Sequence, residues 1–390
     1  MKSTFLSSAW ALILALAAPI GVMAQEPPRY TVTDLGPVGP VYGQAYYITR
    51  NHFIAGAATA TDGTVHATLW FKHAQLDLGT PGLGGSNSVG FGGNVWGQVT
   101  GNAESAGVDP NGEDFCGFKF LGLPTSGSSC VPFVWQAGEM TALPTLGGYN
   151  GEGNQINNRG QVAGYAETDQ ADPNCPAPQV LQFKPVLWSK GEAHALRTFA
   201  GDTDGVALAV NDRGQVAGGS GVCAPFSPQL LFSLQSLHAL LWEPGKRKPI
   251  DLGNLGGTGH FSGNIALNMN GKGEVVGNSD LAGDQANHAF LWTREGGMRD
   301  LGTLPGDFIS AGLGINDKTE VVGVSLDANF NLRAYLWRDG RMTDLNSLVS
   351  AKTPLSLLLA CSINADGQIV GFAVDKVTGE GHAFLATPKD

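Results

Sequence analysis

Charged residues are scarce in this sequence of 390 residues, since Asp, Glu, Lys and Arg make up only 15% of it. The helix-favouring residues Lys and Glu are few, whereas 56 glycines favour tight turns. This composition argues against a helical protein and predicts an all-β chain of short strands. Basic residues are also outnumbered, 23 against 34 acidic ones, and the net charge of -11 argues against nucleic acid and anionic membranes as partners.

Long apolar runs are missing after the first 24 residues. Residues 1–24 have the layout of a secretory signal peptide: a basic residue, an apolar run and then Val22-Met23-Ala24. Pro19 and Gly21 interrupt the run, which is short for a bilayer span, so the alternative of a retained anchor is disfavoured. We expect cleavage after this leader and a single domain over 25–390 that is secreted or periplasmic, with no membrane span.

Common catalytic motifs are missing as well. The chain has no Gly-x-Ser-x-Gly, no His-Glu-x-x-His and no phosphate-binding Gly-Lys-Ser/Thr motif. The expected channel strands carry few acids, chiefly Glu152 and Asp204. A glycosidase needs two carboxylates at a defined separation, so this shortage disfavours that activity.

Three short motifs recur along the chain and dominate it. The first is Ile-Asn-x-x-Gly-x-Val-x-Gly, with copies that start at Ile48, Gly93, Ile156, Val210, Met269, Ile315 and Ile363. The second is His-Ala-Phe-Leu-Trp, with copies that end at Trp70, Trp135, Trp188, Trp242, Trp292, Trp337 and Ala386. The third, Met-x-Asp-Leu-Gly, follows six of these. The shortest units repeat every 45 to 48 residues, which is typical of four-stranded propeller blades.

The seventh copy of the third motif stands at the front, over residues 30–36. A linear solenoid has no reason to begin with the final strand of its repeat, whereas a closed ring needs its first and last repeats to share a blade. We therefore predict a seven-bladed β-propeller of four-stranded blades, closed by the N-terminal strand pairing in the last blade beside residues 382–385. Short turns follow Ile-Asn and Trp, and they must share one face because consecutive antiparallel strands reverse direction.

These motifs, in this order over nearly all of residues 25–390, resemble the extracellular HAF repeat family. The family is named for the tripeptide that stands here at His288-Ala-Phe290 and His382-Ala-Phe384. The resemblance implies an exported repeat protein, and the family has no established activity. Pro132 and Pro185 stand where the motif has alanine, so we predict that their strands are edges or bent.

Residues that recur at one position of the repeat are expected to be structural. The recurring histidines are His66, His238, His288 and His382, and the recurring aspartates are Asp34, Asp77, Asp251, Asp300 and Asp344. We expect the aspartates to bond backbone groups at strand ends. Metal ligation by the histidines is disfavoured, because residues of different blades would have to converge on one ion. His260, in a long connection, has no visible partner and is a candidate for binding.

Insertions break the regularity in three neighbouring blades. We count residues along the chain from the last Gly of the first motif to the Trp that ends the second motif, or to Ala386 in the last blade. This count is 14 or 15 in four blades. It is 34 in blade 2, from Gly101 to Trp135, and 24 in blades 3 and 4. A wall of loops on one face of a regular scaffold is a common origin of a binding site.

Four of the five cysteines lie in these insertions. In an exported protein we expect them to pair. Of the three pairings we favour Cys116 with Cys130, closing a local loop, and Cys175 with Cys223, joining adjacent blades. Cys361 is expected to be a buried free thiol.

Acidic clusters in two connections are candidates for ligand binding. Asp109, Asn111, Glu113 and Asp114 lie in the blade 2 insertion, and Asp202–Asp204 form a second cluster. Clustered oxygen ligands suit calcium, but neither segment has the full spacing of a calcium loop. We therefore favour solvated acidic turns, and we predict no resident metal or cofactor.

The leading hypothesis is an exported binding module without catalytic activity. Its ligand, a carbohydrate or a protein, would bind the loop face of blades 2 to 4, and the protein is expected to be a monomer. The alternative is a hydrolase or lyase that acts on an extracellular polysaccharide at the channel mouth. That alternative requires Glu152, Asp204 and His260 to converge. A structural repeat without a ligand is the third hypothesis.

Overall fold

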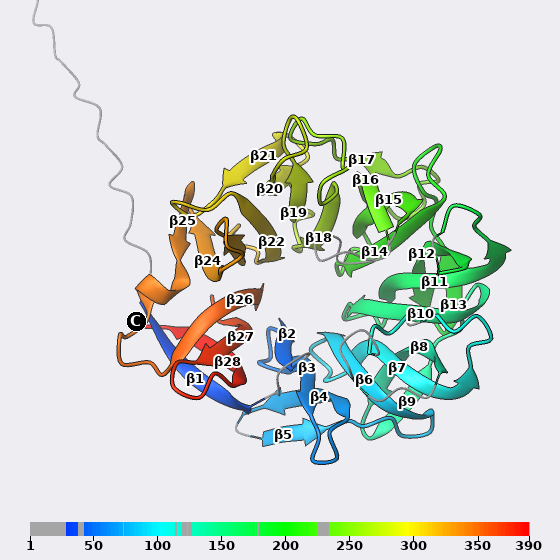
Figure 1. Cartoon of the computed structure of the whole chain (residues 1–390), viewed down its shortest axis with the longest axis horizontal. Coiled ribbons are helices and arrows are strands. Elements are labelled where there is room, and N and C mark those ends of the chain that lie inside the picture. Colours follow the sequence, from blue (N-terminus) through cyan, green and yellow to red (C-terminus); the bar gives the residue numbers. More distant parts are fainter. Residues whose placement is uncertain are drawn as a thin grey trace, which may run out of the picture.

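The computed structural model shows seven four-stranded antiparallel sheets arranged as blades of a β-propeller (Figure 1). It describes residues 29–37, 43–72, 74–113, 115–118, 123, 127–175, 177, 179–224 and 234–389. The expected leader, 1–24, lies outside these residues. The described part of the chain has one short 3-10 helix, Leu345–Leu348, and no helix with the length and hydropathy of a membrane span.

Blades 1 to 4 follow the chain from the first strand, at the axis, outward. Blade 1 has β2 (Gln44–Ile48), β3 (Ile54–Thr59), β4 (Val65–Phe71) and β5 (Ala74–Asp77). Blade 2 has β6 (Gly84–Gly93), β7 (Val99–Val108), β8 (Ser128–Gln136) and β9 (Glu139–Ala142). Blade 3 has β10 (Gly147–Ile156), β11 (Val162–Ala171), β12 (Leu181–Ser189) and β13 (Glu192–Ala195). Blade 4 has β14 (Asp204–Val210), β15 (Val216–Cys223), β16 (Leu234–Trp242) and β17 (Ile250–Asp251).

Blades 5 to 7 complete the ring. Blade 5 has β18 (Ile265–Met269), β19 (Val275–Asp280), β20 (Asn287–Thr293) and β21 (Gly297–Gly302). Blade 6 has β22 (Ile309–Ile315), β23 (Val321–Leu326), β24 (Leu332–Arg338) and β25 (Arg341–Asp344). Blade 7 has β26 (Leu355–Ile363), β27 (Ile369–Asp375), β28 (Gly381–Pro388) and, as its outer strand, β1 (Tyr30–Pro37).

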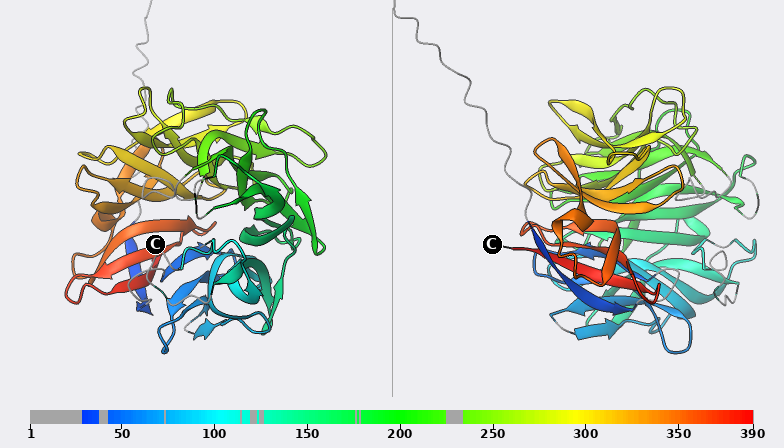
Figure 2. Two further views of the ribbon diagram at one scale, coloured as in Figure 1. Left: turned by 45° about the vertical axis from the view of Figure 1, so that its right-hand side comes forward. Right: turned by 60° about the vertical axis from the view of Figure 1, so that its left-hand side comes forward.

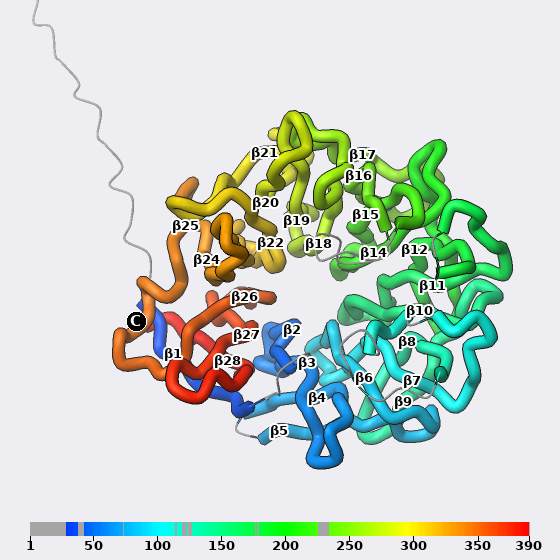
Figure 3. Tube along the Cα trace, viewed as in Figure 1, coloured from blue at the N-terminus to red at the C-terminus, as the bar shows by residue number. Residues whose placement is uncertain are grey.

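The ring closes as the displaced motif predicts. β1 pairs antiparallel with β28, with Thr31 opposite Thr387 and Asp34 opposite Phe384. Figure 3 shows this blue N-terminal segment beside the red C-terminal one, and the turned views of Figure 2 show a closed ring rather than an open spiral. The prediction of a closed seven-bladed propeller is confirmed.

The two faces of the ring differ. The turns from the first to the second strand and from the third to the fourth strand lie on one face, which we call the turn face. Connections from the second to the third strand, and from one blade to the next, lie on the opposite face, which we call the insertion face. This follows from the reversal of direction at each antiparallel strand.

Asparagines of the first motif link neighbouring blades on the turn face. Asn157 Oδ1 accepts hydrogen bonds from the backbone N–H groups of Arg159 and Gln161, which closes its own hairpin. Its Nδ2 donates to the carbonyl oxygen of Asn211 in the next blade, at 3.0 Å. The same inter-blade bond is made by Asn94, Asn211, Asn270, Asn316 and Asn364. These buried amides are fully used by the fold, so the repeated asparagines are structural.

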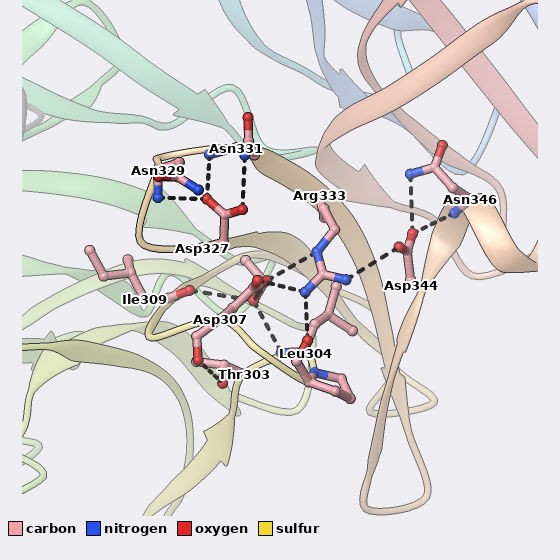
Figure 4. Close-up of polar contacts among 12 residues, drawn as sticks. Thr303, Leu304, Asp307, Ile309, Asp327, Asn329, Asn331, Arg333, Asp344 and Asn346 are labelled. Atoms are coloured by element: carbon pink, nitrogen blue, oxygen red, sulfur yellow. Dashed lines mark hydrogen bonds and ion pairs between the residues drawn. The ribbon is translucent and has the colours of Figure 1, made fainter.

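Recurring histidines and aspartates join the third and fourth strands of a blade. The pairs, at 2.8 to 3.0 Å from His Nδ1 to a carboxylate oxygen, are His66 with Asp77, His288 with Asp300 and His382 with Asp34. Each aspartate also accepts a backbone N–H two residues on, as Asp77 does from Gly79. In blade 6 Arg333 replaces the histidine and binds Asp307, near Asp344 (Figure 4). The expectation that the aspartates bond backbone groups is confirmed.

The prolines of the second motif do not lie in edge strands. Pro132 is in β8, which pairs with both β7 and β9, and Pro185 is in β12, which pairs with both β11 and β13. The prediction of edge strands was wrong, because the N–H at this position does not belong to the strand ladder. In blade 1 it is the N–H of Ala67, which donates to Ser88 Oγ of the next blade at 2.9 Å. A proline at this position therefore removes no ladder bond.

Each proline faces a glycine of the next blade in place of that serine. A Cβ atom at Gly151 would lie 3.1 Å from Pro132 Cδ, and one at Gly205 would lie 3.1 Å from Pro185 Cδ. Where proline removes the backbone N–H donor, glycine replaces the serine whose hydroxyl would accept it. The proline ring then occupies the space of the serine side chain. The two positions are complementary across the blade boundary.

We predict that Pro132→Ala lowers the free energy of unfolding by about 1–3 kcal/mol, since it leaves a buried N–H without an acceptor. The double variant Pro132→Ala/Gly151→Ser should recover most of this loss, because it restores the alanine–serine pair that blade 1 uses. Denaturant unfolding of the two single variants and the double variant measures the coupling. Purely additive losses would contradict the complementarity.

Candidate functional site

The insertions of blades 2 and 3 extend the sheets beyond the insertion face. The second strands β7 and β11 have 10 residues each, whereas β3 of blade 1 has 6. The sheets of blades 2 and 3 therefore project on this face. The loops that follow are held by side chains rather than by further regular structure.

Two disulfides brace these loops, in the predicted pairing. Cys116–Cys130 closes the blade 2 insertion onto β8, and Cys175–Cys223 joins the blade 3 insertion to the end of β15 in blade 4. Cys361 is a buried free thiol whose pKa is raised to about 12 by burial. The disulfides fix the walls of the face by covalent bonds.

A buried amide holds three carboxylates between blades 2 and 3. Asn150 Nδ2 lies 3.3 Å from Asp109 Oδ2, 3.1 Å from Glu113 Oε2 and 3.0 Å from Glu167 Oε2. All four side chains are buried. The expectation of solvated acidic turns was therefore wrong for Asp109 and Glu113. We call Asn150, Asp109, Glu113, Glu167 and Gln179 the Asn150 cluster.

The Asn150 cluster ties the insertions together. Glu113 Oε1 accepts the backbone N–H groups of Val180 and Leu181, at 2.5 and 3.1 Å, which fastens the blade 2 loop to β12. Asp109 accepts the N–H groups of exposed Asn111 and of Glu113, which closes its own turn.

No three His, Cys, Asp or Glu side chains of the described residues have the geometry of a metal site. Asp114, the other candidate in this loop, lies outside the described residues.

A proton is part of this cluster at neutral pH. Burial, together with the nearby Glu113 carboxylate, raises the pKa of Glu167 to about 8. Gln179 Nε2 donates to Glu167 Oε1 at 2.9 Å, which only partly offsets these effects. The raised pKa favours the protonated form of Glu167 near pH 7.

Three exposed hydrophobic side chains flank the cluster. Val108, Tyr149 and Val180 are 73%, 44% and 37% exposed, and each is next in sequence to a cluster residue. We call these three residues the insertion-face patch. Sequence reasoning missed them, since their exposure depends on strand register at the loop boundary.

Glu152 and Asp204 are both buried in the fold. Burial raises the pKa of Glu152 to about 7, and Asn102 Nδ2 donates to its Oε2 at 2.8 Å. Burial also raises the pKa of Asp204 to about 6. Asp204 Oδ1 accepts the N–H of Phe183 at 2.9 Å, in the way that Asn150 accepts the N–H of Cys130. Asp204 is therefore an inter-blade link, and the expectation of a solvated acidic turn was wrong for it as well.

His260 lies on the exposed rim of blade 5, with Nδ1 2.7 Å from Thr258 Oγ1. Among the described residues, no hydrogen bond or ion pair joins His260, Glu152 and Asp204. The structure places them in three separate networks. The convergence that the polysaccharide-degrading alternative requires is not seen.

Comparisons with known proteins give structural likenesses alone. No family model matches the chain, and no curated protein does. An oligogalacturonate lyase in complex with manganese is 13% identical, over 93% of this chain and 97% of its own, with a TM-score of 0.47. A lectin from Burkholderia pseudomallei is 11% identical, over 93% and 98%, with a TM-score of 0.41. A Trypanosoma rangeli sialidase is 9% identical, over 93% and 60%, with a TM-score of 0.39. Likenesses this weak indicate nothing about what the chain binds or catalyses.

Proposed function

We propose that this chain is an exported binding module without catalytic activity, and that it contacts an extracellular ligand through the insertion-face patch. The observation that carries the proposal is the position of Val108, Tyr149 and Val180 around the buried Asn150 cluster. Exposed apolar side chains on a rigid support are typical of interaction surfaces. The polar groups beneath them bond one another and so stiffen the surface instead of reacting.

Rigidity favours binding at this face. Two disulfides and the bonds of Glu113 to β12 order the loops before a ligand arrives, so that little conformational entropy is lost on association. Tyr149 offers a large, amphipathic contact area with few rotatable bonds. Disulfides persist in oxidising compartments, which supports export through the leader 1–24 to the periplasm or the medium. Membership of the HAF repeat family remains a proposal from the motifs.

A patch variant tests the function. Val108→Ser/Tyr149→Ser/Val180→Ser removes the insertion-face patch, and Leu76→Ser/Phe330→Ser/Val377→Ser removes three exposed hydrophobics elsewhere, as the matched control. The wild-type protein is screened by biolayer interferometry against purified exported proteins and polysaccharides. We expect the control to keep the affinity of the ligand found and the patch variant to lose at least tenfold.

Two results would overturn the proposal. One is equal affinity of the patch variant and the wild type. The other is release of reducing ends or unsaturated sugars from a polysaccharide panel, since either product would show catalysis.

A further inference from the structure

The turn face, opposite the insertion-face patch, carries two hollows. The first, which we call the axial cup, has a volume of about 270 Å³ and is lined by the hairpins between first and second strands, with Tyr47 and Gln155 among its residues. The second, which we call the outer cleft, has a volume of about 600 Å³ and lies between blades 2 and 3. Gln136, Glu139, Thr141 and Lys190 are among its lining residues.

Trp96 lies on this face and breaks the repeat. The other tryptophans of the described residues are in third strands and are 7% exposed or less, whereas Trp96 is 68% exposed. It belongs to the hairpin between β6 and β7. The residues at its position in the other blades are all polar: Asn51, Arg159, Arg213, Lys272, Lys318 and Asp366. An indole in this ring of polar residues has no structural counterpart in the repeat.

The Trp96 ring is fixed over the boundary of blades 2 and 3. Its Nε1 donates to the carbonyl oxygen of Asn158 at 3.0 Å, and its backbone N–H donates to Asn94 Oδ1 at 3.1 Å. Asn157 and Asn158 line the axial cup, and Gly160 of the same hairpin lines the outer cleft. The indole of Trp96 is therefore hydrogen-bonded to the hairpin that separates the axial cup from the outer cleft.

The outer cleft has a local cause. Between blades 5 and 6 the guanidinium of Arg299 lies over the Trp337 ring, 5.4 Å from its centroid. Arg299 pairs with the residue before the third-strand tryptophan of its blade, and Thr141 does the same in blade 2. Thr141 is shorter than Arg299, and it lines the outer cleft together with Trp188 of the next blade, which is 1% exposed. An open cleft remains at the same boundary that carries Trp96.

We propose that the boundary of blades 2 and 3 on the turn face binds a segment of a linear polysaccharide. One sugar residue packs its C–H face on Trp96, and its neighbours in the chain occupy the axial cup and the outer cleft. One water molecule occupies ~30 Å³ in the liquid, and each hollow is roughly nine times larger or more. Each hollow is therefore large enough for a sugar ring.

The chemistry of the rim selects a sugar over other polymers. The Gln136 amide, whose Oε1 accepts from Gln98 Nε2, keeps its own Nε2 to donate to a sugar hydroxyl. The charges of Glu139 and Lys190, which also line the cleft, are of both signs. A nucleic acid is disfavoured, because the net charge of -11 repels its phosphates. A protein partner would be expected to need a broader apolar surface than one indole. This site is independent of the insertion-face patch.

Affinity electrophoresis of the mature protein tests the proposal with a neutral β-glucan, a xylan and a galactomannan in the gel. We expect at least one of these polymers to retard the wild type, and Trp96→Ala to raise its Kd at least tenfold. Phe330→Ala, an exposed aromatic outside the site, and the insertion-face patch variant should bind as the wild type does. Binding should also shift the emission of Trp96 to the blue.

A second variant tests the outer cleft. Thr141→Arg copies the arrangement of Arg299 over Trp337 and should fill the cleft. It should weaken binding of long oligosaccharides more than that of a disaccharide, with thermal unfolding unchanged within a few degrees. The proposal is overturned if none of the polymers retards the protein, if Trp96→Ala binds like the wild type, or if single-stranded DNA is bound in their place.

Discussion

Deleting β1 is expected to abolish cooperative folding. A chain that starts at residue 38 loses Tyr30, which is 2% exposed and packs in one core cluster with Leu345, Leu348 and Phe384. It also loses the ladder from β1 to β28. Burial of one aromatic is worth about 1.5–3 kcal/mol, and an unpaired β28 adds an open edge. The lost ladder bonds, at about 0.5–1.5 kcal/mol net each, add several kcal/mol, so the total reaches the lower end of the stability of a domain, about 5–15 kcal/mol. Circular dichroism and size-exclusion chromatography should show unfolded or aggregated protein.

A chain that starts at Arg29 is the matched control for this deletion, because it keeps β1 complete. The peptide 29–37, added in trans, should restore folding of the truncated chain by pairing with β28. The contact between His382 and Asp34 of the peptide gives a second check. A peptide with Asp34→Ala, which lacks this contact, should restore less folded protein. If the truncated chain unfolds cooperatively within a few degrees of the control, the closure at β1 is not what holds the ring.

The fold was predictable because one motif stands out of order. Asp34-Leu35-Gly36 precedes the first complete unit, and only a ring explains that displacement. The wrong prediction of an edge strand at Pro132 and the correct prediction of the ring both came from the repeat. A repeat shows which residues are equivalent, but the partner of each N–H depends on the register between blades. Gly151, which leaves space for the Pro132 ring, lies in the next repeat. The sequence alone did not show that these two positions are in contact.

The candidate site was predictable in position and not in chemistry. Insertion lengths located the loops, and the expectation of export predicted both disulfides. Asn150 and Glu167 were missed, although blade 2 contains the same arrangement: Asn87 Nδ2 donates to Glu104 Oε2 at 2.9 Å, across the same separation of 17 residues. Aligning blades 2 and 3 could have revealed that pair. The burial of Glu113 depends on the neighbouring blade, and no local pattern signals it.

Stability should rise as the pH falls from 8 to 5. The folded state raises the pKa of Glu167 to about 8, of Glu152 to about 7 and of Asp204 to about 6, in each case chiefly through burial. A carboxyl with a raised pKa binds its proton more tightly when folded. Its stabilisation is therefore complete below the unfolded pKa, near 4, and is lost as the pH rises through the folded value. Glu167 alone could supply on the order of 2–4 kcal/mol between pH 5 and 8. Below about pH 4 the trend reverses. Burial raises the pKa of Asp300, but hydrogen bonds donated by His288 and by the N–H of Gly302 together outweigh it and lower that pKa.

Glu167→Gln should flatten this dependence and stabilise the protein at pH 8. A glutamine cannot ionise, and its oxygen can accept the N–H groups of Tyr149 and Asn150 that Glu167 now accepts. Its amide nitrogen then loses only the hydrogen bond that Gln179 Nε2 donates to Glu167 Oε1. Urea unfolding at pH 5, 6.5 and 8 measures the slope, with Glu295→Gln, an exposed site, as control. Wild-type protein that is more stable at pH 8 than at pH 5, or a variant with an unchanged slope, would show that the raised pKa of Glu167 does not cause this dependence.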